Sequence, residues 1–541
     1  MARVAVAVGM LGAALAWAGT GSSKAGEYDV WSCKGPAGQV LSAAAWRVQY
    51  SDAELGDVYK TDDCLTGGPV GLHVNDLGVP PNRKARIDLV FDLPRDEIIS
   101  EYRMTRSIRT AAAPVGSNYA AAIREIQGGI AYDQGCASVL ALPSFDCGSV
   151  GDHSDPDDPG NLVSRSGLGL NGLSTWAACQ TSGCAPPVTA PAAEFNLFSS
   201  VVTVVDNDPP DVTGIGGSLS RPVPVSGLAD LFIEAADTNA GIRALYLDID
   251  GVPTQSITID TSATCAEPFE VARPCPAETG RIFSVNTDPL SEGPHSATGQ
   301  VVDAAGNSTP FGPVPFTVAH PGPPAPDNGI PAVEDPVLRL DRKLVEHSPG
   351  APARVGGTLT TSTGQPISGA SLGVVSTSLG GRESIDRPGD PVVTDAQGRF
   401  LSLDKGSGAR RLAFSYSPFV GGAVAGSVTA TVRSRLKVGL KANPRRVRIG
   451  RTVKFAGRIS GGGDSVRGAD VEIQAIADGR WQTVANATGR ANGTFSWKYR
   501  FRHVKRDALF SFRALIRATP GWPWPTVTSK RIKVRIKVPG T

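Results

Sequence analysis

Alternating cations near the end of the chain are the residues best suited to bind a charged partner. In the segment Lys530–Val538, lysine and arginine alternate with isoleucine and valine. Side chains two residues apart on a strand share one face, so this pattern predicts a row of positive charge on the solvent side. The segment Phe495–Phe501 repeats the alternation. The cations that we expect to contact an anionic partner are Lys498, Arg500, Arg502, Lys533, Arg535 and Lys537.

The net charge of the whole chain conceals this basic region. The formal charge is only +2, but residues 433–541 hold 25 Lys and Arg against five acidic residues. Residues 1–432 hold 28 basic and 46 acidic side chains. Solubility alone needs no excess of one sign, so the asymmetry favours an anionic partner. The partner classes are anionic cell-surface polymers, acidic carbohydrate, phospholipid surfaces, nucleic acid, or the acidic part of the same chain.

Two tryptophans in the basic region could recognise a sugar. Trp522 and Trp524 lie in Gly521–Pro525, where prolines remove backbone donors and exclude a regular central strand. Aromatic rings on a rigid loop can stack on sugar rings or bases. The alternative is that both rings cover the end of a β-sandwich.

An acidic loop at Gly151–Gly160 offers ligands for calcium, the one cofactor that the sequence suggests. Ca²⁺ binds several carboxylate and carbonyl oxygens from a flexible loop. The loop lacks the glycine and the terminal glutamate of an EF-hand, so a solvated acidic loop is the alternative. The candidate ligands are Asp152, Asp155, Asp157 and Asp158.

The sequence contains no recognisable catalytic motif. The chain has no HExxH motif, and its six histidines are widely separated. Two carboxylates on one strand face, as a glycoside hydrolase would need, are also absent from the pattern. We therefore expect no enzyme and assign no catalytic residue. The alternative is an extracellular carbohydrate-active enzyme, with its active site in residues 27–205 and the remaining modules for targeting.

Residues 1–26 have the features of an export signal. Arg3 precedes the apolar segment Val4–Trp17, and cleavage is expected after residue 18 or residue 25. No second apolar run reaches the roughly 20 residues that a membrane span needs. We expect a secreted or cell-surface protein without a transmembrane segment in the mature chain; the oligomeric state stays open.

Eight cysteines, an even number, agree with an oxidising compartment. None of their spacings is of the CxxC type, so we expect the cysteines to form disulfides and not to bind a metal. Cys265 and Cys275 are isolated from the others and should pair with each other. Pairing of sequence neighbours is one hypothesis for the remaining six, which are Cys33, Cys64, Cys136, Cys147, Cys179 and Cys184.

The composition favours turn-rich β structure. The 541 residues include 63 Gly and 42 Pro, and only 19% are charged. At roughly 100–200 residues per domain, this length predicts several domains. Ala85–Phe91 and Phe198–Val205 read as strands, whereas Ser117–Gln127 is the nearest candidate for a helix. We expect an all-β chain, with an N-terminal jelly-roll-like sandwich followed by three immunoglobulin-like or transthyretin-like sandwiches.

Proline-rich segments divide the chain into four expected modules. Asp206–Pro210 should end the last strand of the first module and open a linker, because each proline removes a backbone donor. A second proline-rich linker covers 319–337. The modules are named by their residues: the first is 27–205, the second 210–318, the third 338–430 and the fourth 433–541.

Short motifs add resemblances to known families. The first module resembles lectin-like N-terminal domains of secreted bacterial β proteins that begin as Tyr28–Cys33 does, and Val302–Asn307 resembles the end of bacterial immunoglobulin-like repeats. Gly364–Ala370 and Thr394–Phe400 resemble a carboxypeptidase regulatory-like (transthyretin-like) module. These resemblances imply a secreted, multi-module protein whose modules bind ligands or serve as structural supports. We therefore expect a binding or adhesion protein that attaches to anionic cell-surface or carbohydrate polymers.

Overall fold

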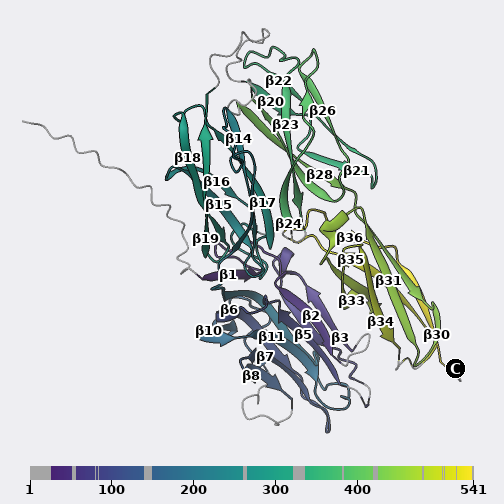
Figure 1. The fold of residues 1–541 in the computed structure, drawn as a ribbon. Helices are drawn as coiled ribbons and strands as arrows, with labels where there is room; N and C mark the ends of the chain where they lie inside the picture. The colour runs from purple at the N-terminus through teal and green to yellow at the C-terminus, as the bar shows by residue number, and fades with distance from the viewer. Residues whose placement is uncertain are drawn as a thin grey trace, which may run out of the picture.

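The computed structural model describes residues 26–51, 57–79, 81–82, 84–138, 149–259, 265–320, 336–380, 383–417, 425–477, 480–501, 504, 506–519 and 521–538. The expected export signal, Cys147 and Arg502 lie outside these residues. The described residues form 37 strands and three short 3-10 helices. The prediction of an all-β chain is therefore confirmed (Figure 1).

The first module consists of two antiparallel sheets. β5 (Ala85–Phe91) has the bounds expected from the sequence, but the candidate helix at Ser117–Gln127 forms the strand β7 (Tyr119–Ile126). One sheet has the order β10 (Leu162–Leu170), β6 (Ile98–Thr110), β12 (Ala193–Val205), β4 (Val70–Val74) and β3 (Val58–Asp62), with β1 (Glu27–Ser32) on β12 and β9 (Ser149–Val150) on β6. The other has the order β2 (Trp46–Ser51), β5 (Ala85–Phe91), β11 (Gly172–Cys179), β7 (Tyr119–Ile126) and β8 (Ile130–Ala137).

The second module also has two sheets. A tight turn at Asp250 and Gly251 joins β15 (Ile242–Ile249) to β16 (Val252–Thr258), and its φ angles of 50° and 78° are both left-handed, as such a hairpin requires. One sheet contains β13 (Asp211–Gly216), β14 (Leu228–Ala236) and β17 (Glu278–Asn286). The other contains β16 (Val252–Thr258), β15 (Ile242–Ile249), β18 (Gly293–Asp303) and β19 (Ser308–Val318).

The third module is built in the same way. Its last strand runs to Ser434, so Arg433, which we had expected to begin the fourth module, belongs to the third. One sheet contains β24 (Glu383–Pro388), β23 (Ser371–Leu379), β27 (Ala409–Tyr416), β28 (Gly426–Ser434) and β21 (Leu344–His347), with β25 (Val392–Val393) on β23. The other contains β20 (Val337–Leu340), β22 (Ala353–Thr360) and β26 (Arg399–Asp404).

The fourth module carries the basic strands on two different sheets. Phe455 and Phe512, one from each sheet, have ring centroids 4.7 Å apart in the core between them. One sheet contains β33 (Arg480–Thr488), β32 (Asp470–Ala477), β35 (Ala508–Ile516), β37 (Ile532–Lys537) and β30 (Arg446–Arg448), with β36 (Val527–Thr528) on β35. The other contains β29 (Lys437–Asn443), β31 (Thr452–Ser460) and β34 (Thr494–Arg500).

Strand pairing also joins modules that are distant in sequence. β3 pairs with β33 through Lys60 and Thr483, so one sheet continues from the first module into the fourth. The Tyr50 hydroxyl donates a hydrogen bond to the carbonyl oxygen of Thr483 at the same contact. β17 pairs in parallel with β24, which joins the second module to the third. The chain therefore folds back so that the fourth module lies beside the first (Figure 1).

The buried cores divide differently from the modules. One continuous apolar core runs through the first and second modules, whereas the third and fourth modules each have a core of their own. Three disulfides lie in the first two modules: Cys33–Cys64, Cys179–Cys184 and Cys265–Cys275. Cys136 is also disulfide-bonded.

Candidate functional site

The fourth module presents its cations on two outer faces. On β34 and β37 the apolar side chains turn into the sandwich, while Lys498, Arg500 and the cations of β37 are exposed. The first basic face covers β29, β31 and β34 and consists of Lys437, Lys441, Lys454, Arg458, Lys498 and Arg500. The second basic face covers β30 and β37 and consists of Arg446, Arg448, Lys533, Arg535 and Lys537.

The fold separates residues that the sequence pattern had grouped together. β34 and β37 belong to the two opposed sheets of one sandwich, so their outer faces point in opposite directions. Lys498 and Arg500 therefore lie on the first basic face, whereas Lys533, Arg535 and Lys537 lie on the second. Sequence alternation shows which side of a strand is exposed, but it cannot show which sheet the strand joins.

Cations of like charge face one another across neighbouring strands. Lys454 on β31 lies directly opposite Lys498 on β34. In the parallel pair β30 and β37, Arg446 is next to Arg535, and Arg448 is next to Lys537. Like charges in directly opposed positions destabilise a sheet.

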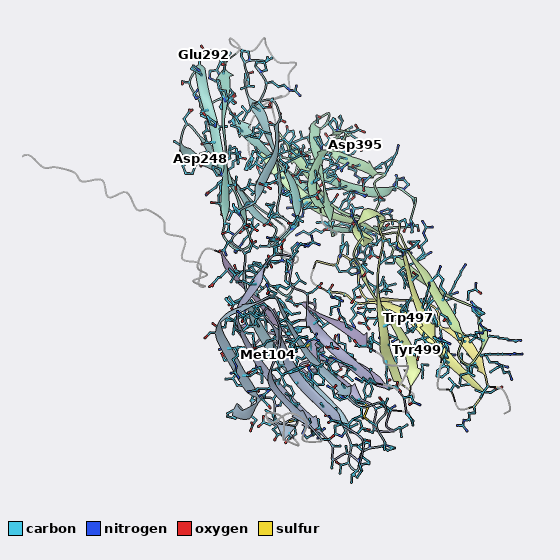
Figure 2. All side chains as sticks on the ribbon, turned by 60° about the horizontal axis from the view of Figure 1, so that its bottom comes forward. Met104, Asp248, Glu292, Asp395, Trp497 and Tyr499 are labelled. Carbon is cyan, nitrogen blue, oxygen red and sulfur yellow. A yellow bond between two sulfur atoms is a disulfide. The ribbon has the colours of Figure 1, made fainter. Side chains whose placement is uncertain are left out.

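Acidic side chains do little to relieve this repulsion. Within the described ranges, Lys537 forms an ion pair with Asp507, whereas Lys454 and Lys498 form none. Among the described residues, no ion pair therefore compensates the positive charge of this cross-strand pair on the first basic face. Figure 2 shows long side chains of the fourth module projecting into solvent on the side away from the first module.

The two tryptophans of the 521–525 loop have different environments. Trp524 is only 2% exposed, and its indole N–H donates a hydrogen bond to the Ser434 carbonyl oxygen at 2.7 Å. The expectation that Trp524 presents its ring to a ligand is therefore wrong, because the ring fills the core. Trp522 is partly exposed and lines a cavity between modules.

The expected calcium loop folds around its own backbone. The Asp152 carboxylate accepts hydrogen bonds from the Ser154 N–H at 2.7 Å and from its hydroxyl at 2.6 Å. Asp155 and Asp158 accept from backbone N–H groups two residues further along the chain. Asp157 lies 3.6 Å from the Lys34 ammonium. Calcium binding by this loop stays a prediction.

A buried group of carboxylates, which the sequence did not reveal, lies between the first and second modules. One carboxylate oxygen from each of Asp206, Asp237 and Asp303 lies within 4.8 Å of the others, and the three side chains are 1%, 7% and 0% exposed. Glu97, 3% exposed, lies near them and accepts hydrogen bonds from the Tyr28 hydroxyl. We call these four residues the carboxylate cluster.

Hydrogen bonds hold the carboxylate cluster in place. Asp237 accepts from the backbone N–H groups of Asn239 and Gly241 at 2.8 and 2.9 Å. Asn307 donates its backbone and side-chain N–H groups to Asp303 at 2.8 and 2.9 Å. Asp206, expected at the start of a linker, accepts a hydrogen bond from the Ala240 N–H at 3.1 Å and is part of a packed junction.

Burial determines the charge of the carboxylate cluster. Burial and the neighbouring Asp206 raise the pKa of Glu97 to about 9. Burial also raises the pKa of Asp303 to about 7 and that of Asp237 to about 6. Protons thus relieve the repulsion near neutral pH. Three carboxylates at this spacing also have the oxygen ligands that Ca²⁺ prefers, which makes them the described residues best placed to hold a cation.

Two cavities lie between modules. The smaller, of about 480 Å³, separates β2 of the first module from β33 and β34 of the fourth, and Tyr50 and Lys498 are among its lining residues. Trp497 and Tyr499 of β34, labelled in Figure 2, also line it. The larger, of about 680 Å³, is lined by all four modules. Neither cavity belongs to residues 27–205 alone, where the enzyme hypothesis would place an active site.

Comparisons with known proteins give information only on the general fold. No family model matches the chain, and no curated protein matches it. Within the described residues, no helix has the length and apolar character needed to cross a membrane.

Several solved structures have similar β domains. A tetra-tandem repeat from the extending region of a large adhesion protein has 12% identity and a TM-score of 0.24, over 84% of this chain and 96% of that one. The Yersinia pseudotuberculosis adhesin InvE has 15% identity and a TM-score of 0.24, over 37% of this chain and 58% of that one. The Escherichia coli adhesin FdeC has 12% identity and a TM-score of 0.21, over 61% of this chain and 100% of that one. At these scores, the comparisons leave the function to be argued from the chain's own residues.

Proposed function

We propose that this chain is a secreted, non-enzymatic attachment protein that binds an anionic cell-surface polymer through the basic faces of its fourth module. The observation that carries the proposal is the direct opposition of Lys454 and Lys498, which form no ion pair among the described residues. Repulsion between them destabilises the sheet when no partner is bound. A polymer with repeated negative groups removes that repulsion and gains an ionic contact with each cation.

The geometry of the first basic face suits an extended polymer. Neighbouring strands lie about 4.8 Å apart, and alternate residues along a strand are roughly 6.5–7 Å apart. Cations on three neighbouring strands therefore form a grid and not a deep pocket. Such a grid contacts several charges of one polymer and requires no particular sequence or sugar. The second basic face, on the opposite side, can hold a second polymer segment.

Salt dependence of binding tests the proposal on the full chain. Binding to immobilised heparin, to a phosphate-rich wall polymer and to double-stranded DNA is measured between low and high salt. Affinity should fall steeply with salt, because exposed charges are screened beyond roughly 10 Å at 0.1 M ionic strength. With DNA, the slope of log affinity against log salt reports how many phosphates are contacted.

Matched variants locate the binding surface. Combining Lys454→Gln, Lys498→Gln and Arg500→Gln should weaken binding at least about tenfold, which corresponds to roughly 1.4 kcal/mol. The control combines Arg339→Gln, Arg354→Gln and Arg399→Gln, which removes three exposed cations from the third module and should leave affinity unchanged. Equal binding by both triple variants and the unmodified chain would refute the assignment of the first basic face.

A further inference from the structure

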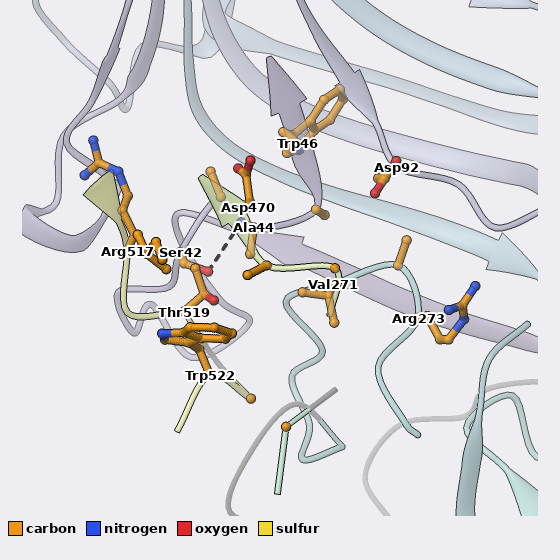
Figure 3. Close-up of a pocket in the computed structure, with 18 of the residues that line it drawn as sticks. Ser42, Ala44, Trp46, Asp92, Val271, Arg273, Asp470, Arg517, Thr519 and Trp522 are labelled. Atoms are coloured by element: carbon orange, nitrogen blue, oxygen red, sulfur yellow. Dashed lines mark hydrogen bonds between the residues drawn. The ribbon is translucent and has the colours of Figure 1, made fainter. Parts of the chain in front are cut away.

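The larger cavity lies where all four modules meet. Its volume of about 680 Å³ is within the range of roughly 300–1,000 Å³ typical of small-ligand sites. Ser42–Trp46 of the first module, Val271–Arg273 of the second, Gly380 of the third and Thr519 and Trp522 of the fourth contribute to its wall. Figure 3 shows these segments converging from different modules. We call it the four-module cavity.

Two tryptophans contribute to the wall: Trp46, which is only 3% exposed, and Trp522, which is partly exposed. Trp522 lies along one side of the cavity, and Ala44 of the first module is among the residues drawn around the same space (Figure 3). Trp524 is buried in the core behind Trp522, and the centroids of the two rings are 5.1 Å apart. Trp524 therefore supports the Trp522 ring. The Trp522 ring is therefore held in place by a buried neighbour.

The charged groups of the wall are nearly balanced. Lys60 pairs with Asp62 at 3.0 Å, and Arg517 forms an ion pair with Glu472. Asp470 is exposed and accepts a hydrogen bond from the Asn486 amide at 2.8 Å. Such a wall offers both donors and acceptors and does not select a strongly charged ligand.

From this arrangement we infer that the four-module cavity binds a short saccharide, with one sugar ring stacked on Trp522. A sugar has an apolar ring face that suits an indole ring, and each of its hydroxyl groups both donates and accepts hydrogen bonds. The mixed carboxylates and guanidinium groups of the wall match those hydroxyls. An enclosed space of this volume admits a mono- or disaccharide or the end of a glycan, whereas a long polymer fits the open basic faces.

This site goes beyond the proposed polymer binding, and it has a structural consequence. A ligand in the four-module cavity contacts modules that are far apart in sequence. A ligand that binds only the folded arrangement stabilises it in proportion to the logarithm of its concentration. A bound saccharide should therefore raise the unfolding temperature of the full chain.

The test uses defined disaccharides and the full chain. Cellobiose, N,N′-diacetylchitobiose, lactose and mannobiose are each titrated by calorimetry up to about 10 mM, which detects the weak affinities, Kd of about 1 mM, expected for small ligands. At least one should bind saturably and raise the unfolding temperature. Trp522→Ala should weaken that binding at least about tenfold. Trp522→Phe, which keeps an aromatic face, should retain part of it.

Two further variants keep the inference falsifiable. Ala44→Trp blocks the cavity from the first module and should abolish saccharide binding even if Trp522→Ala disturbs its own loop. Trp481→Ala is the matched control, because Trp481 lies in the fourth module outside the cavity wall and should leave binding unchanged. Failure of all four disaccharides to bind, or full binding by both Trp522→Ala and Ala44→Trp, would overturn the inference.

Polymer binding separates this inference from the proposed function. The cavity variants Trp522→Ala and Ala44→Trp should bind heparin as the unmodified chain does. The triple glutamine variant of Lys454, Lys498 and Arg500 should bind the disaccharide normally. Loss of both activities in one variant would show that the two sites are not separate and would overturn the assignment of the saccharide to the cavity.

Discussion

Each half of the chain holds a group of like charges close together: carboxylates in the first half and cations in the second. The repulsion within each group is lowered in a different way. In the first half, residues 26–320, the carboxylate cluster is buried in a core shared by two modules, and protons neutralise it. In the second half, residues 336–538, the crowded cations are exposed on strands of the fourth module. Buried crowding makes a structure sensitive to pH, whereas exposed crowding leaves charge free for a partner.

Reduction of the disulfides should separate the two halves most clearly. The three disulfides of the described residues lie in the first half, and removal of a native disulfide typically costs about 2–5 kcal/mol. Hydrogen exchange with and without reductant should show a loss of protection in residues 26–320 and retained protection in residues 336–538. Equal loss in both halves would mean that the β17–β24 and β3–β33 contacts are needed to keep the second half folded.

The carboxylate cluster predicts that the first half loses stability as the pH rises. Its acids have raised pKa values in the folded state, so the folded chain binds more protons than the unfolded chain between about pH 4 and the folded pKa. Asp303 has a pKa of about 7 and Glu97 a pKa of about 9, so the free energy of unfolding should fall between pH 5 and pH 9. Each tenfold difference in proton affinity between the folded and unfolded chain contributes up to about 1.4 kcal/mol.

A substitution at Glu97 tests this pH dependence. Glu97→Gln keeps the protonated shape and should flatten the fall in unfolding temperature between pH 7 and pH 9. Glu292→Gln, at an exposed position, is the control and should leave the profile unchanged. The measurements include a chelator, so that a divalent cation does not take the place of the protons. An identical profile for Glu97→Gln and the unmodified chain would contradict the cluster as its source.

The smallest effect concerns the exposed cations. Lys454→Glu turns a like-charged cross-strand pair with Lys498 into an opposite-charged one and should stabilise the chain by about 0.2–1 kcal/mol at low salt. Lys437→Glu, whose cross-strand neighbour is Ser460, should gain less. Chemical denaturation of the full chain measures both. Equal changes for the two variants would show that repulsion across the strands is not the cause.

Local patterns in the sequence predicted a large part of the fold. Alternation of apolar and polar residues indicated β34 and β37, and it correctly predicted that their cations face solvent. The segment Ala85–Phe91 was recognised as the strand β5. These features depend on neighbours within a few residues, so the sequence determines them directly.

Only the tertiary structure decided which segments meet. Tyr119–Ile126 is rich in alanine, yet it forms a strand because β11 and β8 pair with it on both sides, and this pairing outweighs a weak local preference for helix. The carboxylate cluster combines Glu97, a residue between two modules and two residues of the second module, and the four-module cavity combines all four. Contacts between residues so distant in sequence depend on how whole modules pack together. Patterns among neighbouring residues do not determine that packing.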